Sequence, residues 1–517
     1  MYVLHKLRQI GMRVRVFEAG SDVGGTWYWN RYPGCRCDVD SLEYSYSFDD
    51  KLQQEWKWPE RYGTQGEILK YVSHVADRFD LRRDIAFNTR VKTAEYNTST
   101  GQWTLTTDKG DTATASFCIM ATGNLSTPRV PNFKGVEGFK GKWYHTGLWP
   151  HEGVDFTQQR VAVIGTGSSS VQSIPIIAAQ AKHLHVFQRT ANFSLPAVNR
   201  PMDQREETQH KAEYNDRRRA AYDTPFGIAG YPPPTQSALD VPKEERDRIY
   251  EAKWQRGGSI SFLYSFTDLL LNKEANDTAA EFVRNKIRSI VKDPETAKTL
   301  CPNDHPIGTK RLVLDTNYYQ TYNRDNVTLV NARKAPIQEI TPTGLRTTEQ
   351  EYEFDAIVFA TGFDAMTGAL AEIDVHTTAG ANLRTKWHGG PRTYLGLMVA
   401  DFPNLFLITG PGSPGVKSQM ILAVEQHTDW IVDCLKHMQS RGFHRIEADA
   451  DAETKWVEHV NEVAHSTLYP LANSWYMGAN IPGKPRVFMP YVAGMHNYKK
   501  RCDAVATNGY EGFTLTQ

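Results

Sequence analysis

The stretch Arg160-Val-Ala-Val-Ile-Gly-Thr-Gly-Ser-Ser-Ser170 decides the fold. Its aliphatic run predicts a buried strand, and the glycines that follow predict a tight turn into a helix. In a dinucleotide-binding unit the first glycine allows the turn, the second admits a pyrophosphate, and a third small residue lets helix and strand pack closely. Ser170 stands where Gly or Ala is usual and is small enough for that packing. The residues predicted to bind dinucleotide phosphates are Gly165, Thr166, Gly167, Ser168 and Ser169.

The next predicted strand indicates which dinucleotide binds. It covers residues 183–190 and ends in Gln-Arg-Thr. An NAD-binding unit carries Asp or Glu at this strand end, where the acid binds a ribose hydroxyl. A cation there suits a 2′-phosphate instead. We therefore predict NADP(H), held by Arg189 and Thr190.

Two apolar strands, within residues 116–123 and 353–362, end in the same Ala-Thr-Gly turn. One such turn is weak evidence, but a pair indicates two nucleotide-binding domains. The predicted fold is α/β, a two-dinucleotide-binding-domain flavoprotein with two Rossmann-like domains. Its expected parts are an FAD domain begun by residues 1–138 and completed by 365–517, a linker at 139–155, and an NADP domain at 156–364. Charged helical patterns at about 200–300 predict a helical insertion in the NADP domain.

The start of the chain lacks an expected motif. Residues 2–10 look helical, and residues 13–18 alternate like a strand that ends in the acid Glu18. A glycine-rich turn should precede such an acid by about 20 residues. Glu18 lies too close to Met1, so we expect the chain to be truncated, with Met1 an internal methionine. The alternative is a genuinely short protein, whose FAD pyrophosphate would lack a helix N-terminus.

Composition narrows the possible partners. Lys+Arg and Asp+Glu are both 59, which argues against nucleic acid and polybasic membrane contacts. The six scattered cysteines indicate a reduced, cytoplasmic protein and form no zinc-like pattern, so no metal is expected. The longest apolar stretch, residues 260–271, is too short to span a bilayer. We expect a monomer.

Residues 139–150 read Phe-Lys-Gly-Lys-Trp-Tyr-His-Thr-Gly-Leu-Trp-Pro and fill the pattern F-x-G-x-x-x-H-x-x-x-W-P. This segment resembles the fingerprint of the type I Baeyer–Villiger monooxygenases. Further similarity lies in G-G-T-W-Y-W-N-R-Y-P-G at 24–34, G-T-K-R at 308–311 and S-W-Y-M-G-A-N-I-P-G at 474–483. The chain looks closest to the phenylacetone and steroid monooxygenase branch.

The resemblance implies an enzyme that binds FAD and NADP(H) and uses dioxygen to insert an oxygen beside a ketone carbonyl. The product is an ester or lactone, formed through a flavin C4a-peroxide. Arg311 matches the catalytic arginine of the family, and Asp38 matches the aspartate that orients it. An arginine is a permanent cation and so can stabilise an anionic peroxide.

The resemblance also implies the other site residues. His145 would be part of a hinge and not a base, in a fingerprint made of Phe139, Gly141, His145, Trp149 and Pro150. The further cofactor contacts are Glu18, Gly25, Thr26, Trp27, Arg36, Asp38, Tyr44, Val91, Lys310, Arg311, Met420 and Trp475. The loop that shapes the substrate pocket contains Pro414, Gly415, Val416 and Met420. Lys417 is an unexpectedly polar residue in that loop, which suggests a different substrate range.

Three alternatives compete with this interpretation. A disulfide reductase is dismissed, since Trp27 stands where its first redox thiol would be and Cys35 and Cys37 are poorly spaced. A flavin-dependent N- or S-oxygenase has a similar fold but a fingerprint without the final Trp-Pro. A non-catalytic remnant that binds NADP(H) but not FAD is suggested by the missing glycine turn.

Overall fold

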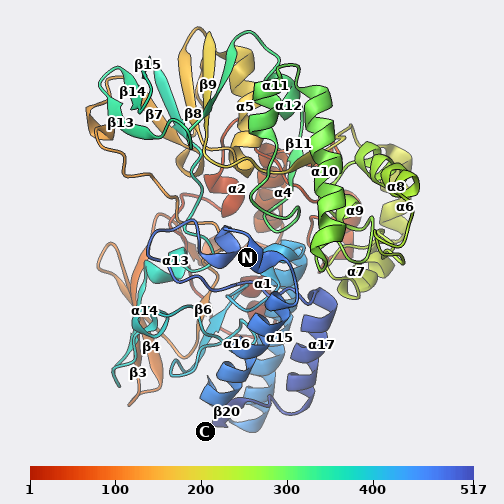
Figure 1. Ribbon diagram of the computed structural model, residues 1–517. Coiled ribbons are helices and arrows are strands. Elements are labelled where there is room, and N and C mark those ends of the chain that lie inside the picture. The colour runs from red at the N-terminus through yellow and green to blue at the C-terminus, as the bar shows by residue number, and fades with distance from the viewer.

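The computed structural model describes residues 1–517. The strand that precedes the glycine motif lies in the middle of the largest sheet (Figure 1). The five strands are parallel, in the order β12 (Val327–Asn331), β9 (His183–Gln188), β8 (Arg160–Ile164), β16 (Ala356–Phe359) and β7 (Lys142–His145). The central β8 and β16 are fully buried at Val161, Val163 and Val358. Both faces are therefore covered, as expected for a parallel sheet.

The predicted helical insertion is confirmed. It consists of α6 (Gln204–Ala212), α7 (Tyr214–Tyr222), α8 (Lys243–Arg256), α9 (Ser259–Leu263), α10 (Lys273–Ile290) and α11 (Pro294–Leu300). Helix α10 begins where the Asn272 side chain accepts the backbone N–H groups of Glu274 and Ala275. It buries Ala275, Ala279, Val283 and Ile287, whose spacing of four residues forms one apolar face. Helix α10 contacts α8, α11 and α12 (Tyr318–Thr321), and α12 in turn contacts α5 (Ser168–Gln180).

The lower part of the molecule joins segments from both ends of the chain (Figure 1). Strand β6 (Cys118–Met120) pairs with β18 (Leu405–Leu407), and β3 (Val91–Asn97) pairs with β17 (Asp374–Thr377). β3 also forms a hairpin with β4 (Gln102–Thr107), followed by β5 (Thr112–Ala115). Helix α1 (Tyr2–Gln9) lies against α15 (Met420–Arg441), and the Tyr2 hydroxyl donates to Asp429 at 2.8 Å. The third predicted segment thus folds back onto the first.

The other elements are smaller. The helices are α2 (Thr26–Trp29), α3 (Asp50–Glu55), α4 (Gln65–Arg78), α12 (Tyr318–Thr321), α13 (Gly368–Ala371), α14 (Leu383–Lys386), α16 (Ala450–His465) and α17 (Met495–Thr507). The strands are β1 (Val16–Phe17), β2 (Ile85–Ala86), β10 (Ser194–Pro196), β11 (Val313–Asp315), β13 (Ile337–Thr341), β14 (Gly344–Thr347), β15 (Glu351–Glu353), β19 (Arg445–Ala448) and β20 (Phe513–Thr516). No helix is both long and apolar enough to cross a membrane.

The structure differs from two of the sequence predictions. The segment expected to be a linker, residues 139–155, contains strand β7 at residues 142–145. This strand pairs with β16 and forms one edge of the large sheet. The strand expected over residues 13–18 is reduced to Val16–Phe17, and it pairs only with β2. Strands β1–β2 and β6–β18 form two separate two-stranded sheets. A preceding strand and glycine turn stay a prediction.

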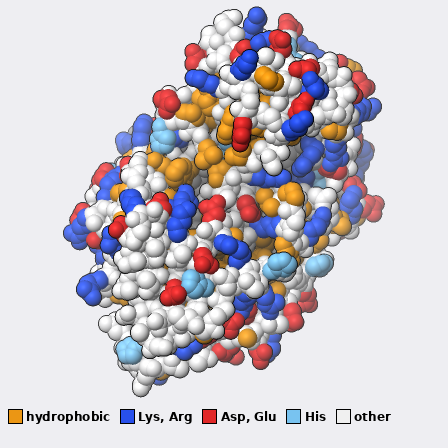
Figure 2. Space-filling model, turned by 90° about the vertical axis from the view of Figure 1, so that its left-hand side faces the viewer, with side chains coloured by type: hydrophobic (Ala, Val, Ile, Leu, Met, Phe, Trp, Pro, Cys, Tyr) orange, Lys and Arg blue, Asp and Glu red, His pale blue; other side chains and the backbone are white.

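Two crossover segments connect the parts and lie side by side. Arg129 donates its backbone N–H to Gly362 at 2.8 Å, and Asp364 donates to Thr127 at 2.9 Å. Hydrophobic side chains gather between the upper and lower parts on the face shown in Figure 2. The large hydrophobic residues that remain exposed include Val130, Trp143 and Leu148, which lie in or next to a crossover segment and β7.

Candidate active site

Arg311 and Asp38 come from distant parts of the chain and form a bidentate ion pair. Nε of Arg311 donates to Oδ2 of Asp38 at 2.7 Å, and Nη2 donates to Oδ1 at 2.6 Å. The Arg311 side chain is 35% exposed and Asp38 22%, so the pair is only partly covered. Burial opposes the charge on Arg311, but the Asp38 carboxylate outweighs it and raises the pKa of Arg311 above its ordinary value. Arg311 is therefore a cation at every working pH.

The third hydrogen bond of Arg311 goes to the predicted substrate loop. Its Nη1 donates to the carbonyl oxygen of Val416 at 2.8 Å. Val416 lies in a short 3-10 helix, Gly415–Lys417, between Pro414 and the start of α15 at Met420. A guanidinium carries five N–H groups, and these bonds use three of them. Two donors remain for an oxygen anion at this place.

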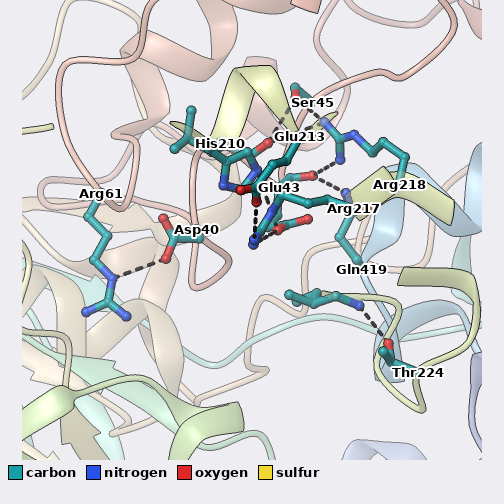
Figure 3. Close-up of polar contacts among 12 residues, drawn as sticks. Asp40, Glu43, Ser45, Arg61, His210, Glu213, Arg217, Arg218, Thr224 and Gln419 are labelled. Carbon is teal, nitrogen blue, oxygen red and sulfur yellow. Dashed lines mark hydrogen bonds and ion pairs between the residues drawn. The ribbon is translucent and has the colours of Figure 1, made fainter. Parts of the chain in front are cut away.

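A buried polar cluster fixes the loops that carry these residues (Figure 3). Nη2 of Arg217 binds the carboxylate of Glu43 at 2.9 Å, and Nη1 of Arg218 donates to the Glu43 carbonyl at 2.7 Å. The same carbonyl accepts from Nε2 of Gln419 at 2.5 Å. Helix α7 thus ties the segment after Asp38 to the segment after Val416. This cluster was not predicted from the sequence, since its members are distant along the chain and only the run of three arginines at 217–219 hints at it.

The NADP turn has the geometry that its sequence predicts. Gly165 has φ +113°, and a Cβ atom there would lie 2.5 Å from the carbonyl oxygen of Ala360. Only glycine fits such a place. Helix α5 begins at Ser168 after Gly167, which provides no side-chain cap, and no atom lies within 4 Å of a Cβ built at Gly167. The first N–H groups of α5, which include Ser168 and Ser169, are thus open to a phosphate.

The expected 2′-phosphate residues lie in a cationic cluster at the ends of β9 and β12. Arg189 and Thr190 follow β9, and the guanidinium of Arg333, just after β12, donates to Oγ1 of Thr190 at 3.1 Å. Lys310 lies close to both arginines, and burial lowers its pKa, while Asp304 opposes that shift. Arg333 was not among the residues predicted from the sequence to bind the 2′-phosphate. Its place after the strand adjacent to β9 was the available signal.

His145 connects the fingerprint to both crossover segments. Its Nδ1 accepts the N–H of Gly147 at 3.0 Å, so the proton of the neutral ring lies on Nε2. Nε2 donates to the carbonyl of Arg129 at 3.1 Å and lies 3.2 Å from the hydroxyl of Thr361. Burial lowers the pKa of His145 to about 4. Both nitrogens are engaged and the residue is buried, which favours a structural link over a base.

The rest of the fingerprint is packed closely. Phe139 and Trp149 are buried, and Trp149 lies against Tyr144 and Phe156. A Cβ atom at Gly141 would lie 2.5 Å from the carbonyl oxygen of Asp355. Pro150 follows Trp149 and ends the motif. These residues pack β7 against the neighbouring segments.

The expected FAD contacts are distributed around α2. The Glu18 carboxylate accepts the N–H of Gly20 at 2.7 Å, close to the strand pair that leads to Val91. A Cβ at Gly25, just before Thr26, would meet no atom within 4 Å, which leaves room for a ligand. Nε1 of Trp27 donates to the Tyr44 hydroxyl at 3.2 Å.

Two more expected cofactor residues flank the substrate loop, and one is engaged elsewhere. Met420 and the half-buried Trp475 pack with Tyr476 in the cluster that also holds Val416. The guanidinium of Arg36 binds Glu60 at 3.2 Å and the Tyr62 carbonyl at 3.1 Å, so its side chain serves the packing of these loops.

All six cysteines are buried and unpaired, and no group of His, Cys, Asp and Glu could hold a metal ion. Burial raises the pKa of Cys35 to about 12, which leaves no reactive thiolate there. The structure thus offers no redox dithiol next to the site.

Comparison with known proteins agrees with this geometry. Residues 7–213 match the family described as pyridine nucleotide-disulphide oxidoreductase. The chain is 44% identical over 513 residues to a Baeyer-Villiger monooxygenase of Pseudooceanicola batsensis, covering 99% of this chain and 93% of that relative. The solved structure of oxidized steroid monooxygenase bound to NADP matches with a TM-score of 0.95 and 50% identity. The OTEMO complex with FAD and NADP matches with 0.96 and 42%. Each covers 100% of this chain and 97% of the other.

Fold and site therefore define an oxidoreductase with two dinucleotide-binding domains. Within that class, the chain belongs to the Baeyer–Villiger monooxygenase family. The predicted fold class and family are confirmed.

Proposed function

We propose that this protein binds FAD and NADPH and uses dioxygen to convert a ketone to an ester or lactone. The observation that carries the proposal is Arg311, fixed by Asp38 and by the substrate loop with two N–H groups still free. The solved relatives hold FAD and NADP, which supports the same cofactors here. Bound FAD supplies the chemistry of dioxygen activation, with electrons from NADPH.

The chain's own residues have distinct roles in this proposal. Glu18, Gly25, Thr26, Trp27 and Tyr44 would hold FAD. The N-terminus of α5 would bind the NADP pyrophosphate, and Arg189, Lys310 and Arg333 would bind its 2′-phosphate. Arg311 would stabilise negative charge on oxygen beside the ketone, because a preorganised cation in a partly closed site costs little reorganisation. Asp38 orients that cation. His145 holds the two crossover segments together.

We also infer that the protein lies in the cytoplasm. Six unpaired, buried cysteines suit a reducing cytoplasm. We infer a monomer, because both nucleotide sites are built from one chain.

The test is a product assay with the purified protein. Flavin absorption bands should accompany the protein, and NADPH oxidation should rise when cyclohexanone or phenylacetone is added. Gas chromatography should then show the lactone or ester. Oxidation of thioanisole without any ester would instead identify a heteroatom oxygenase. Bound NADP without flavin would identify a non-catalytic remnant.

A further inference from the structure

Lys417 brings a second cation next to Arg311. It follows Val416, whose carbonyl accepts from Arg311, at the end of the short helix in the substrate loop. The side chain is half-buried, and its Nζ makes no ion pair or hydrogen bond within the chain. Most buried ammonium groups are paired, because leaving water without a partner is costly. An unpaired lysine at this place therefore calls for a ligand.

Two tyrosines enclose the ammonium group. Nζ of Lys417 lies 4.4 Å from the ring centroid of Tyr469 and 4.7 Å from that of Tyr476. Aromatic faces attract a cation but donate no hydrogen bond to an anion. The Tyr476 hydroxyl is buried and faces the Arg311 guanidinium, and its O–H donates to no acceptor in the chain. Two unused donors, an ammonium and a phenol, thus lie beside the substrate loop.

The local charge is unbalanced. Asp38 is engaged by both Nε and Nη2 of Arg311, so it neutralises that cation and not Lys417. The group of Arg311, Asp38 and Lys417 retains one positive charge. A half-buried cation of this kind is stabilised by an anion that accepts hydrogen bonds. A carboxylate can accept from the ammonium and from the phenol at the same time.

We propose that Lys417 and Tyr476 bind the carboxylate of an oxo-acid substrate and so orient its ketone toward Arg311. The inference rests on the proposed function, since it names the substrate class of that same site. It treats Lys417 as a specificity-determining residue. It also explains why a lysine occupies a loop that otherwise carries Pro414, Gly415 and Val416.

Preference for the oxo-acid should depend on pH. Burial, followed by the neighbouring Arg311 cation, lowers the pKa of Lys417 to about 7. The charged groups that face Lys417 are Arg311 and, beyond it, Asp38, while Tyr469 and Tyr476 present neutral rings. Below pH 7 the lysine is charged and binds a carboxylate. Above pH 7 the free enzyme loses that charge, so preference for the oxo-acid should decline.

The experiment compares 4-oxocyclohexane-1-carboxylate with its methyl ester on the flavin-loaded enzyme. We expect kcat/KM at pH 6.5 to favour the acid by about 10- to 100-fold, the range for hydrogen bonds to a charged group. Lys417→Leu should abolish this preference, and Tyr476→Phe should reduce it. Lys417→Arg should keep it and extend it above pH 8, because arginine stays charged. Lys298→Leu, a change at a 76% exposed lysine of α11, is the matched control and should leave the ratio unaltered.

Equilibrium binding of cyclohexanecarboxylate, measured by calorimetry, provides a readout apart from turnover. The wild type should bind it more tightly than Lys417→Leu by a similar factor. Equal turnover of acid and ester, or equal loss of both in Lys417→Leu, would overturn the inference while the proposed function stands. If neither ketone is oxidised but cyclohexanone is, the inference also fails. If no ketone is oxidised at all, the proposed function fails with it.

Discussion

Arg311 is the residue on which the proposed chemistry depends. Its guanidinium makes three hydrogen bonds, two to Asp38 and one to Val416, and keeps two free donors. Replacing it with alanine removes the only cation oriented by both Asp38 and the substrate loop. We expect Arg311→Ala to lower kcat/KM for ketone oxidation by about 10²- to 10³-fold, the usual cost of losing an oxyanion donor. Steady-state ester formation measures this.

Arg311→Lys should also lose at least about tenfold, because an ammonium cannot form the two parallel bonds to Asp38. Arg219→Lys, at a 74% exposed position of α7, is the control. Normal ester formation by Arg311→Ala would contradict the role given to this residue.

His145 gives a prediction about acid stability. Its pKa in the folded protein is about 4, against an ordinary 6.5, so between these values the unfolded chain takes up a proton that the folded chain excludes. Stability that is present above pH 6.5 is therefore lost as the pH falls toward 4. The advantage of the wild type over His145→Gln should shrink by about 2 kcal/mol from pH 7 to pH 5.

Urea unfolding at the two pH values measures the difference, with the exposed His444→Gln as control. A difference that stays constant with pH would mean that His145 is protonated in the fold.

At the residue scale, the sequence predicted the Arg311–Asp38 pair only through family resemblance. Nothing in the spacing of residues 38 and 311 places them together. Arg333 and the Glu43–Arg217–Arg218 cluster escaped prediction because their partners are set by tertiary packing. Lys417 was visible as an odd residue, but its aromatic surroundings come from Tyr469 and Tyr476, more than 50 residues later.

At the scale of the elements, the position of strand β7 explains why the fingerprint has a glycine, Gly141, just before this strand. A Cβ at Gly141 would lie 2.5 Å from the backbone oxygen of Asp355, which cannot move without disturbing β16. Gly141→Ala should destabilise the protein by about 1–3 kcal/mol, as overpacking does. Gly138→Ala is a matched control, because no atom lies within 4 Å of its Cβ position. Thermal unfolding of both variants tests this, and equal melting temperatures would show that β7 does not need the glycine.

In the proposed function, the residues at the ends of β9 and β12 determine which dinucleotide binds. Arg333→Ala removes a cation that contacts Thr190, so we expect KM for NADPH to rise about 10- to 100-fold while that for NADH changes little. The exposed Arg346→Ala of β14 is the control. An equal rise for both dinucleotides would place the 2′-phosphate elsewhere.

For the molecule as a whole, the order of motifs along the chain was sufficient to predict the architecture. Each glycine turn follows an apolar strand, and both Ala-Thr-Gly turns lie at crossovers, so the two-part fold could be predicted from local patterns. The pairing of β6 with β18 joins residues 287 apart, and that of β3 with β17 joins residues 281 apart. The sequence indicated only that the last segment returns to the first. The residues of β7 were predicted to be part of a linker.

The central claim is that this chain transfers one oxygen atom from dioxygen to a ketone. The most direct measurement is turnover of cyclohexanone with NADPH under oxygen-18-labelled dioxygen, followed by mass spectrometry of the product. The account predicts a lactone that carries one labelled oxygen and whose formation requires NADPH, and it predicts that Arg311→Ala forms this labelled lactone about 10²- to 10³-fold more slowly. Unchanged cyclohexanone, with flavin bound and NADPH consumed, would contradict it.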